Sequence, residues 1–227
     1  MSTFLTVLLL VSSISCGKKN TNSARNVITS EEPNEPSTDG DYRAVLKTLN
    51  TSLKGNVAFG TAIMKISDNK FSVKLNLAHV PKGTKHIQSV HTNGKCPNLV
   101  SDANADSFID IVEGMTSFGK VLIPLDRDLS AQLLGNDYYP KGIYSYSEEA
   151  DLSLLVADLS APDEDPNDNL VKLKPGEALN FGRRTLVISS ISENNDLPSS
   201  VRTIGDFASE ASIPIACGEI VRIENEE

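Results

Sequence analysis

Hydrophobic and polar residues alternate along much of the chain beyond residue 41. In residues 70–80, KFSVKLNLAHV, every second side chain from Phe71 to Leu77 is apolar. This period of two is typical of a half-buried antiparallel strand. A turn is expected just before it, at Asp68-Asn69, because both residue types favour tight turns. Further strand-like stretches cover residues 42–50, 57–67, 119–126, 142–159, 183–191 and 214–223.

These stretches are short, and neither a strand–helix alternation nor an internal repeat accompanies them. The pattern predicts one short helix, around Asp128 to Leu134. Chains with many short strands and few helices form β-sandwiches or β-barrels. We therefore predict an all-β domain over residues 42–227.

The first 41 residues have a different composition. In residues 1–15 an apolar stretch, Phe4 to Val11, is too short to span a bilayer and is followed by small residues, which is the layout of a secretory signal peptide. Ser13-Ile14-Ser15-Cys16 resembles the bacterial lipobox, so we expect a lipid on Cys16. The alternative is an ordinary cleaved signal with an incidental cysteine. Residues 16–41 are poor in apolar residues and are expected to form a flexible tether.

Composition and charge limit the function classes. The chain has 227 residues, of which 39% are hydrophobic and 22% charged, enough for one domain with one core. Its formal net charge is -9, without a cluster of Lys and Arg, so we expect no nucleic-acid partner. The lipid implies the bacterial cell envelope. Because Gly17 is not an acidic retention signal, we expect anchoring in the outer membrane, on its periplasmic or surface face.

The remaining cysteines indicate a disulfide. If Cys16 carries a lipid, Cys96 and Cys217 are left as an even pair in an oxidising compartment. We expect them to be joined. Closing a loop of about 120 residues would stabilise the fold by about 4–5 kcal/mol in the chain-entropy description.

Three separated stretches resemble the copper/zinc superoxide dismutase family. VPKGTKHIQSVHTNGKC (80–96) is similar to a strand with closely spaced histidines before Gly-x-Cys. FGRRTLVISS (181–190) is similar to the strand with a late copper histidine, and IPIACGEI (213–220) to the final Ala-Cys-Gly strand. The resemblance covers roughly residues 42–224. It implies a flattened, eight-stranded Greek-key barrel, and a disulfide that joins Cys96 to Cys217.

The same resemblance places poor ligands at the copper positions. His91 matches one copper histidine, but a neighbouring ligand position holds Ser89 and the late copper position holds Ser189. Serine hydroxyls are poor copper ligands. His86 matches a histidine that supports a loop, and Pro214 stands where the family has the arginine that guides superoxide.

A count of histidines leads to the same expectation. The family's paired site needs six histidines and an aspartate, whereas the chain has three histidines. We therefore expect neither copper nor zinc, and no dismutase activity. For His86 and His91 we expect a structural, hydrogen-bonded role, with weak adventitious metal binding as the alternative. His79 is expected at a strand end. A hydrolase is not predicted, since no Gly-x-Ser-x-Gly motif occurs.

A different metal is predicted by DANADSFIDIVE, residues 102–113. Side chains with hard oxygen donors recur there at the spacing of the ligands in an EF-hand calcium loop. Ser107 stands where glycine usually makes the sharp turn, which costs about 1 kcal/mol. The flanks CPNLVS and GMTSFG lack the pattern of the two EF-hand helices, so we expect an isolated calcium loop; the alternative is a solvated acidic loop. The expected ligands are Asp102, Asn104, Asp106, the Phe108 carbonyl, Asp110 and Glu113.

Together these features predict a non-catalytic superoxide dismutase-like envelope lipoprotein. Its domain would be a calcium-stabilised binding or structural module with an unidentified protein or small-molecule partner. One alternative is a copper-binding or active superoxide dismutase-like enzyme. Another is a subunit that completes a metal site with a partner chain.

Overall fold

The computed structural model describes residues 39–82, 84–132, 145–163, 170–191 and 196–224. The predicted signal peptide (1–15), the lipidation site Cys16 and nearly all of the predicted tether (16–41) lie outside the described residues. Within the described part of the chain, no helix is both long and apolar enough to cross a membrane.

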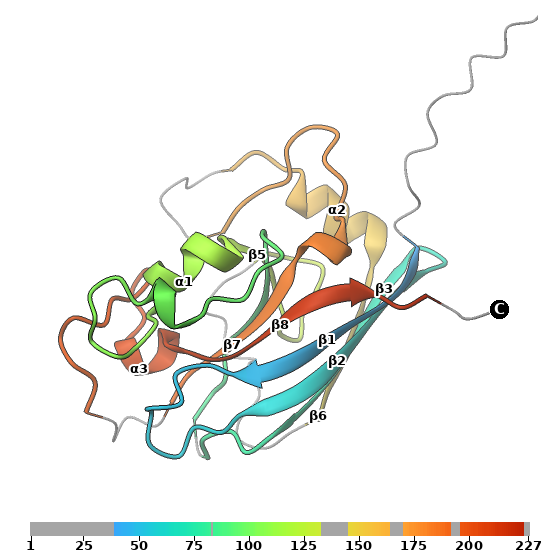
Figure 1. The fold of residues 1–227 in the computed structure, drawn as a ribbon. Helices are drawn as coiled ribbons and strands as arrows, with labels where there is room; N and C mark the ends of the chain where they lie inside the picture. Colours follow the sequence, from blue (N-terminus) through green and yellow to red (C-terminus); the bar gives the residue numbers. More distant parts are fainter. Residues whose placement is uncertain (1–38, 83, 133–144, 164–169, 192–195, 225–227) are drawn as a thin grey trace, which may run out of the picture. The chain divides into compact units, whose positions relative to one another are not determined.

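Eight antiparallel strands form one curled sheet (Figure 1). Their order across the sheet is β5-β4-β7-β8-β1-β2-β3-β6. The domain is mostly β, so the prediction of an all-β domain is confirmed only in this coarser form. The strands are β1 Gly40–Thr48, β2 Phe59–Ser67, β3 Lys70–Ala78, β4 Gln88–His91, β5 Val121–Pro124, β6 Ser145–Asp151, β7 Thr185–Ser189 and β8 Pro214–Arg222.

The strands β1, β2 and β3 bury every second side chain, as their sequence pattern predicted. The turn between β2 and β3 is also confirmed. Asp68 and Asn69 both have positive φ, 53° and 59°, and Ser67 pairs with Lys70 across the turn. Positive φ at two successive positions matches the right-handed twist of the flanking strands and fixes their register.

The main hydrophobic core lies on the inner face of the curled sheet. Phe71 and Phe181 stack there with 5.0 Å between ring centroids, and Tyr42 contacts Phe181 at 5.7 Å. Strands β4, β5 and β7 are buried along their whole length. A second, smaller cluster includes Val187 of β7 and Phe118, which lies outside the sheet. The segments that cover this part of the sheet carry the candidate site.

Helices are more numerous than the sequence pattern indicated. The described residues 128–132 of the expected helix are not helical, because the chain there makes turns between Asp126 and Ser130. The expected strand over residues 142–159 ends at residue 151 and continues as a helix. The helices are α1 Ile111–Phe118, α2 Leu152–Leu159 and α3 Ser209–Ser212, with short 3₁₀ helices η1 Leu99–Ser101 and η2 Phe181–Arg183.

Local signals account for the two longer helices. Asp151 accepts a hydrogen bond from the Leu154 N–H and so caps α2, whose Leu155 and Leu159 are buried one turn apart. Asp110 caps α1 in a capping box with Glu113, in which each side chain accepts a hydrogen bond from the backbone N–H of the other residue. This arrangement gives acceptors to two N–H groups that would otherwise be unpaired at the start of the helix. The flank GMTSFG was therefore wrongly excluded from a helix.

The predicted disulfide is confirmed. Cys96 and Cys217 are bonded, with 5.8 Å between their Cα atoms and a sequence separation of 121 residues. Cys217 is in β8, and Cys96 is in the segment between β4 and η1. The bond therefore ties this segment to the sheet beside the start of the loop 102–113.

Removing the disulfide should lower stability. We expect the double substitution Cys96→Ser/Cys217→Ser to reduce the free energy of unfolding by about 4–5 kcal/mol, because the unfolded chain regains the freedom of a long loop. Urea denaturation under oxidising conditions measures this. Reductant should move the wild-type curve towards that of the variant and leave the variant unchanged. Equal midpoints for the two oxidised proteins would contradict the stabilising role.

Candidate metal centre

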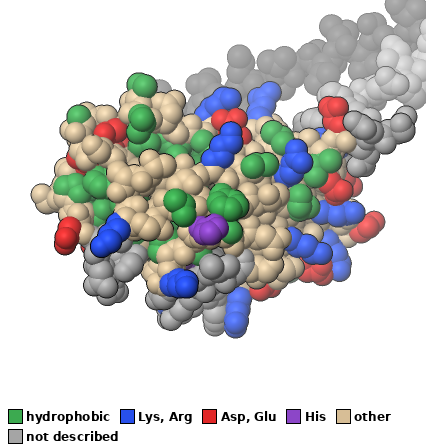
Figure 2. Space-filling model, turned by 60° about the horizontal axis from the view of Figure 1, so that its bottom comes forward, with side chains coloured by type: hydrophobic (Ala, Val, Ile, Leu, Met, Phe, Trp, Pro, Cys, Tyr) green, Lys and Arg blue, Asp and Glu red, His purple; other side chains and the backbone are tan. Residues whose placement is uncertain are grey.

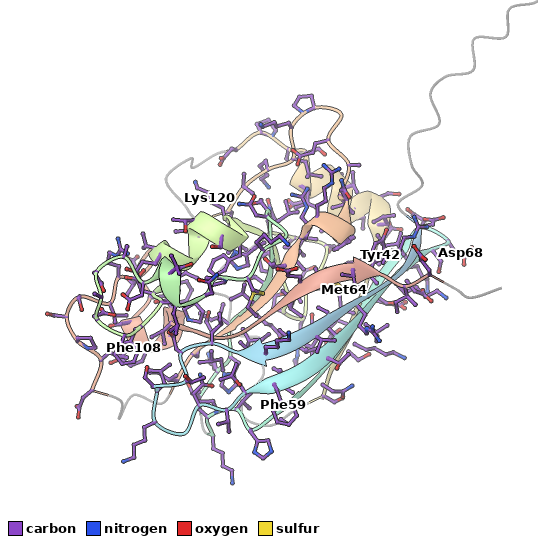
Figure 3. All side chains as sticks on the ribbon, in the orientation of Figure 1. Tyr42, Phe59, Met64, Asp68, Phe108 and Lys120 are labelled. Carbon is purple, nitrogen blue, oxygen red and sulfur yellow. A yellow bond between two sulfur atoms is a disulfide. The ribbon has the colours of Figure 1, made fainter. Side chains whose placement is uncertain are left out.

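The loop Asp102–Glu113 follows η1 and includes the first turn of α1, at one end of the curled sheet (Figure 1). Figure 3 labels Phe108 in this loop, at the opposite end of the molecule from Asp68 in the β2–β3 turn. Ile109 is buried, and Phe108 packs partly against the main core. The loop therefore has an apolar anchor in its second half, while its first half is more exposed.

The first half of the loop curls around its own acidic side chains. Asp102 accepts hydrogen bonds from the backbone N–H groups of Asp106 at 3.2 Å and Ser107 at 2.9 Å. The amide oxygen of Asn104 accepts from Asp106 N–H at 3.0 Å, and Asp106 accepts from Phe108 N–H at 2.9 Å. These side-chain-to-backbone turns bring Asp102, Asn104 and Asp106 together.

Ser107 has a φ of 73°, in the left-handed region that favours glycine. This is the position at which a calcium loop makes its sharp turn. The strain expected from the sequence is therefore present in the backbone.

Asp110 and Glu113 are almost completely buried, with 1% and 3% exposure. Glu113 Oε1 accepts hydrogen bonds from the N–H groups of Ala103 at 3.0 Å and Asn104 at 3.3 Å, and Oε2 accepts from Asp110 N–H at 3.1 Å. Asp110 Oδ1 accepts from Glu113 N–H at 2.8 Å. The carboxylate of Glu113 thus joins the start of the loop to its end.

A guanidinium from a distant segment contacts both buried carboxylates. The Nε of Arg202 donates to Asp110 at 2.8 Å, its Nη2 lies 3.2 Å from Asp110 and from Glu113, and its backbone N–H donates to Asp110 at 3.0 Å. The hydrogen bond that Arg202 donates to the Asp110 carboxylate is the main reason that the pKa of Arg202 is raised. Ser200, in the same segment, donates to Asp106. The segment 200–202 therefore closes one side of the loop.

Asn50 holds the other side of the loop to the sheet. Its side-chain nitrogen donates to the backbone oxygens of Ile109 and Pro214, both at 2.9 Å, and its oxygen accepts from Ile109 N–H at 2.7 Å. Asn50 is buried and has a φ of 53°. A buried amide with three satisfied hydrogen bonds fixes the position of the loop relative to the sheet.

The fit to a metal ion is incomplete in this arrangement. The six predicted ligand residues lie in one compact loop. However, among the residues that the structure describes, no three or more His, Cys, Asp or Glu side chains are close enough together to hold a metal. The oxygens of Glu113 are turned towards N–H groups and Arg202. A cation at the loop centre would have to replace these hydrogen bonds.

The histidines match structural roles. His91 is buried, its Nδ1 lies 2.9 Å from the Gly119 carbonyl and its Nε2 lies 3.0 Å from Ser89 Oγ. Because a carbonyl can only accept, Nδ1 carries the proton and Nε2 accepts from the hydroxyl. Phe118 meets the ring edge-on at 4.5 Å. His86 is buried beside the carbonyl of Pro81 at 3.0 Å, and His79 is exposed immediately after β3.

Where the resemblance would place copper, the structure has a cavity of about 10 Å³. Its polar lining consists of His91, Ser89, Ser189 and Ser212, among apolar neighbours. One imidazole and three hydroxyls do not make a donor set for copper or zinc. The residues present therefore do not fit those metals.

No model of a known protein family matches the sequence, and no match was found among curated proteins. The site is therefore interpreted from its own geometry.

Sequence reasoning did not find Arg202, Ser200 or Asn50. Arg202 and Asp110 are 92 residues apart, and only the fold brings them together. One local signal was present, since Asp110 and Glu113 have the spacing of a helix capping box. It would have predicted α1 from two of the residues that are predicted to be calcium ligands.

Acid should destabilise the protein partly through His91. Burial lowers the pKa of His91 to about 4, against the opposing effect of the Gly119 hydrogen bond. The unfolded chain takes up this proton below about pH 6.5, so the stability present above that pH is lost as the pH falls towards 4. The loss amounts to about 3 kcal/mol.

We therefore expect His91→Gln to be less stable than wild type at pH 7 but to lose less further stability between pH 7 and pH 4. Urea denaturation across this range measures the difference. His79→Gln, at an exposed position, is the matched control and should keep the wild-type profile. Parallel profiles for His91→Gln and wild type would contradict the buried neutral imidazole.

Arg202→Gln should also destabilise the fold. It removes a charged partner from two buried carboxylates, and we expect a loss of about 1–3 kcal/mol at pH 7. Lys65→Gln is the matched control, because Lys65 pairs with Asp41 at 3.9 Å on an exposed surface, where ion pairs contribute about 0–1 kcal/mol. Equal melting temperatures for the two variants would show that Arg202 is not needed by the carboxylates.

Proposed function

We propose that the protein is a non-catalytic, superoxide dismutase-like envelope lipoprotein whose β domain is a binding or structural module with a calcium-binding loop. The loop Asp102–Glu113 carries the proposal. It runs from a 3₁₀ helix, η1, into an α-helix, α1, and turns sharply at the left-handed Ser107. Helix, twelve-residue loop and helix are the parts of an EF-hand, here in a shortened form.

The charge balance of the loop supports a cation. It contains four carboxylates, from Asp102, Asp106, Asp110 and Glu113. The guanidinium of Arg202 pairs with two of them and offsets one negative charge. Ca²⁺ would supply two further positive charges and prefers carboxylate and carbonyl oxygens. In the calcium-bound loop, Glu113 would exchange its N–H partners for the ion.

A non-catalytic role is supported by the donor set around His91. The imidazole is held by Gly119 and Ser89 in a buried position, and the cavity beside it offers serine hydroxyls. These groups would not retain the redox metal that a dismutase must keep bound throughout turnover, since hydroxyls hold copper poorly.

We further assign the sheet to a Greek-key barrel of the superoxide dismutase type, which the strand order supports. Strand β3 lies beside β6, and β4 lies between β5 and β7. The pairs β3–β6 and β4–β7 therefore join strands that are not consecutive in the sequence. Long connections of this kind are typical of Greek keys. The sheet would then be the rigid platform from which the loops are presented.

The envelope location rests on the sequence of the first 41 residues and agrees with the disulfide, which persists in oxidising compartments. A lipid on Cys16 and a tether would hold the domain at the outer membrane. A protein or small-molecule partner would then be bound away from the bilayer.

Calcium titration tests the loop. We expect millimolar Ca²⁺ to raise the melting temperature of the wild-type protein, and Glu113→Gln to abolish this rise, because it removes the bidentate ligand. Arg202→Gln should bind Ca²⁺ up to about ten-fold more tightly than wild type, because it removes a competing positive charge. Isothermal titration calorimetry of the metal alone measures both affinities.

The matched control is Glu149→Gln, which changes an exposed carboxylate paired with Lys70 and should leave the calcium response unchanged. A response that survives in Glu113→Gln would refute the loop assignment. Copper bound by the purified chain together with superoxide turnover would refute the non-catalytic role.

A further inference from the structure

Basic side chains are concentrated in one part of this acidic chain. Residues 42–86 contain 8 of its 21 Lys and Arg residues but only 1 of its 30 Asp and Glu residues. No two of the eight are adjacent in the sequence, so no run of charges marks them. The fold brings them together, because the segment forms β1, β2 and β3, which pair with one another in order.

The outer face of these three strands carries basic residues. The inward side chains are hydrophobic and buried, and those that alternate with them are on the outer face. Arg43 of β1 pairs with Ile63 of β2, which pairs with Lys74 of β3, and all three are exposed. Lys54 in the β1–β2 loop and Lys82 after β3 are also exposed, at the end of the sheet where β2 begins. We call this surface the basic face, formed by Arg43, Lys54, Lys74 and Lys82 with the apolar residues Phe59 and Ile63.

Few acidic side chains offset the charge of these strands. Lys70 is paired with Glu149 at 2.9 Å, and Lys65 lies 3.9 Å from Asp41. Within the part of the chain that the structure describes, no ion pair involves the four basic residues of the basic face. The whole chain has a formal net charge of -9, so this face has the opposite sign to the rest. An exposed positive surface of this kind attracts anions.

Apolar side chains lie among these charges. Phe59 is 50% exposed, Ile63 is 38% exposed, and Val57, just before β2, is 57% exposed. The imidazole of His79 stacks on Phe59, with 5.3 Å between the ring centroids and 29° between the ring planes. Figure 2 shows a histidine beside hydrophobic side chains near the middle of the surface, with Lys and Arg side chains around them. Charge and apolar area therefore occur on one surface.

The backbone holds the aromatic pair at the surface. His79 has a φ of 54°, which is uncommon for a residue other than glycine. The next residue, Val80, is buried. The turn at His79 thus leaves its ring outside, on Phe59, while the chain returns to the core. Because the two rings are already fixed, little ordering is needed when they bind a partner.

This combination favours a lipid surface over a soluble polyanion. Lys and Arg near an anionic bilayer are attracted to its phosphates, and each contributes to binding. Exposed apolar and aromatic side chains enter the boundary between headgroups and acyl chains, where they leave water. The long stems of Lys and Arg lie along the same boundary while their charges reach the headgroups. A soluble polyanion would pair with the charges but would leave Phe59 and Ile63 in water.

From these observations we infer that the basic face docks onto a bilayer that contains anionic phospholipid. The basic side chains bind lipid phosphates, and Phe59, Ile63 and Val57 enter the headgroup boundary. The inference goes beyond the proposed calcium-binding module and does not depend on it. It also does not require a lipid on Cys16, because the basic face lies within the β domain.

A tryptophan in the basic face tests the docking. The chain contains no tryptophan, so Phe59→Trp introduces a single reporter into the full chain. Leu154→Trp is the matched control, because Leu154 is 61% exposed in α2, away from Phe59 (Figure 3). Each variant is mixed with vesicles of phosphatidylcholine, with or without about 30% phosphatidylglycerol. Part of the phosphatidylcholine is brominated and quenches tryptophan that enters the bilayer.

We expect the emission of the Phe59→Trp protein to move to shorter wavelength and to fall by about half on the anionic vesicles, because the ring leaves water. Neutral vesicles should have little effect, and Leu154→Trp should change little on either. An apolar leader or a lipid anchor would bind both kinds of vesicle, so it would not produce this difference. If Phe59→Trp does not fold, Ile63→Trp replaces it.

Charge reversal provides the second test. Lys54→Glu/Lys82→Glu in the Phe59→Trp protein should weaken binding to the anionic vesicles by about ten-fold or more, since two attractions become repulsions. The matched control is Lys174→Glu/Arg183→Glu, which makes the same change of charge at two exposed positions outside the basic face and should leave the affinity nearly unchanged. Thermal melting confirms that both variants fold.

Four outcomes would overturn the inference: equal quenching at positions 59 and 154, equal quenching on neutral and anionic vesicles, no effect of Lys54→Glu/Lys82→Glu, or a response of position 59 to soluble polyphosphate as large as its response to vesicles. The last would assign the face to a polyanion. All measurements contain a calcium chelator, so failure of the calcium-binding loop would leave the docking surface standing, and the reverse also holds.

Discussion

Neutralising two neighbouring buried carboxylates, Asp110 and Glu113, organises one whole end of the molecule. Burying an unpaired carboxylate is strongly unfavourable, so each oxygen must find a donor. The donors come from the start of the loop, from the first turn of α1 and from Arg202. Two segments 92 residues apart in the sequence, the loop with α1 and the stretch around Arg202, are thereby held together. The same demand is the physical basis of the cation that we propose for this loop.

Much of the sheet could be predicted from the sequence because its physical cause is local. The alternation in β1 to β3 and the Asp68-Asn69 turn specify strands and register without knowledge of the rest of the chain. The disulfide followed from counting cysteines. The short α-helices did not follow, because α2 continues directly from β6 and its leucine-rich sequence fits either structure. Its start depends on one cap, Asp151.

The candidate site was predictable only in part. The spacing of the acidic residues in 102–113 can be read from the sequence alone. The same is true of Ser107, the non-glycine residue at the sharp turn. The contacts of Arg202 and Asn50 depend on the fold, because they join residues 92 and 59 positions apart. Histidine scarcity was likewise readable from composition. The packing that makes His91 a buried neutral group, between Phe118 and the Gly119 carbonyl, was not.

The two outer strands of the sheet are protected in different ways. The edge of β5 is covered where Val121 pairs with Leu170 in a single parallel bridge and accepts a hydrogen bond from Val171 N–H. Strand β6 instead carries Glu148, Glu149 and Asp151. Charged side chains on an edge strand repel a second strand that would otherwise add to the free backbone groups. Acidic gatekeepers on β6 should therefore keep the sheet from growing into aggregates, which leaves side-chain surfaces, and not strand edges, for association.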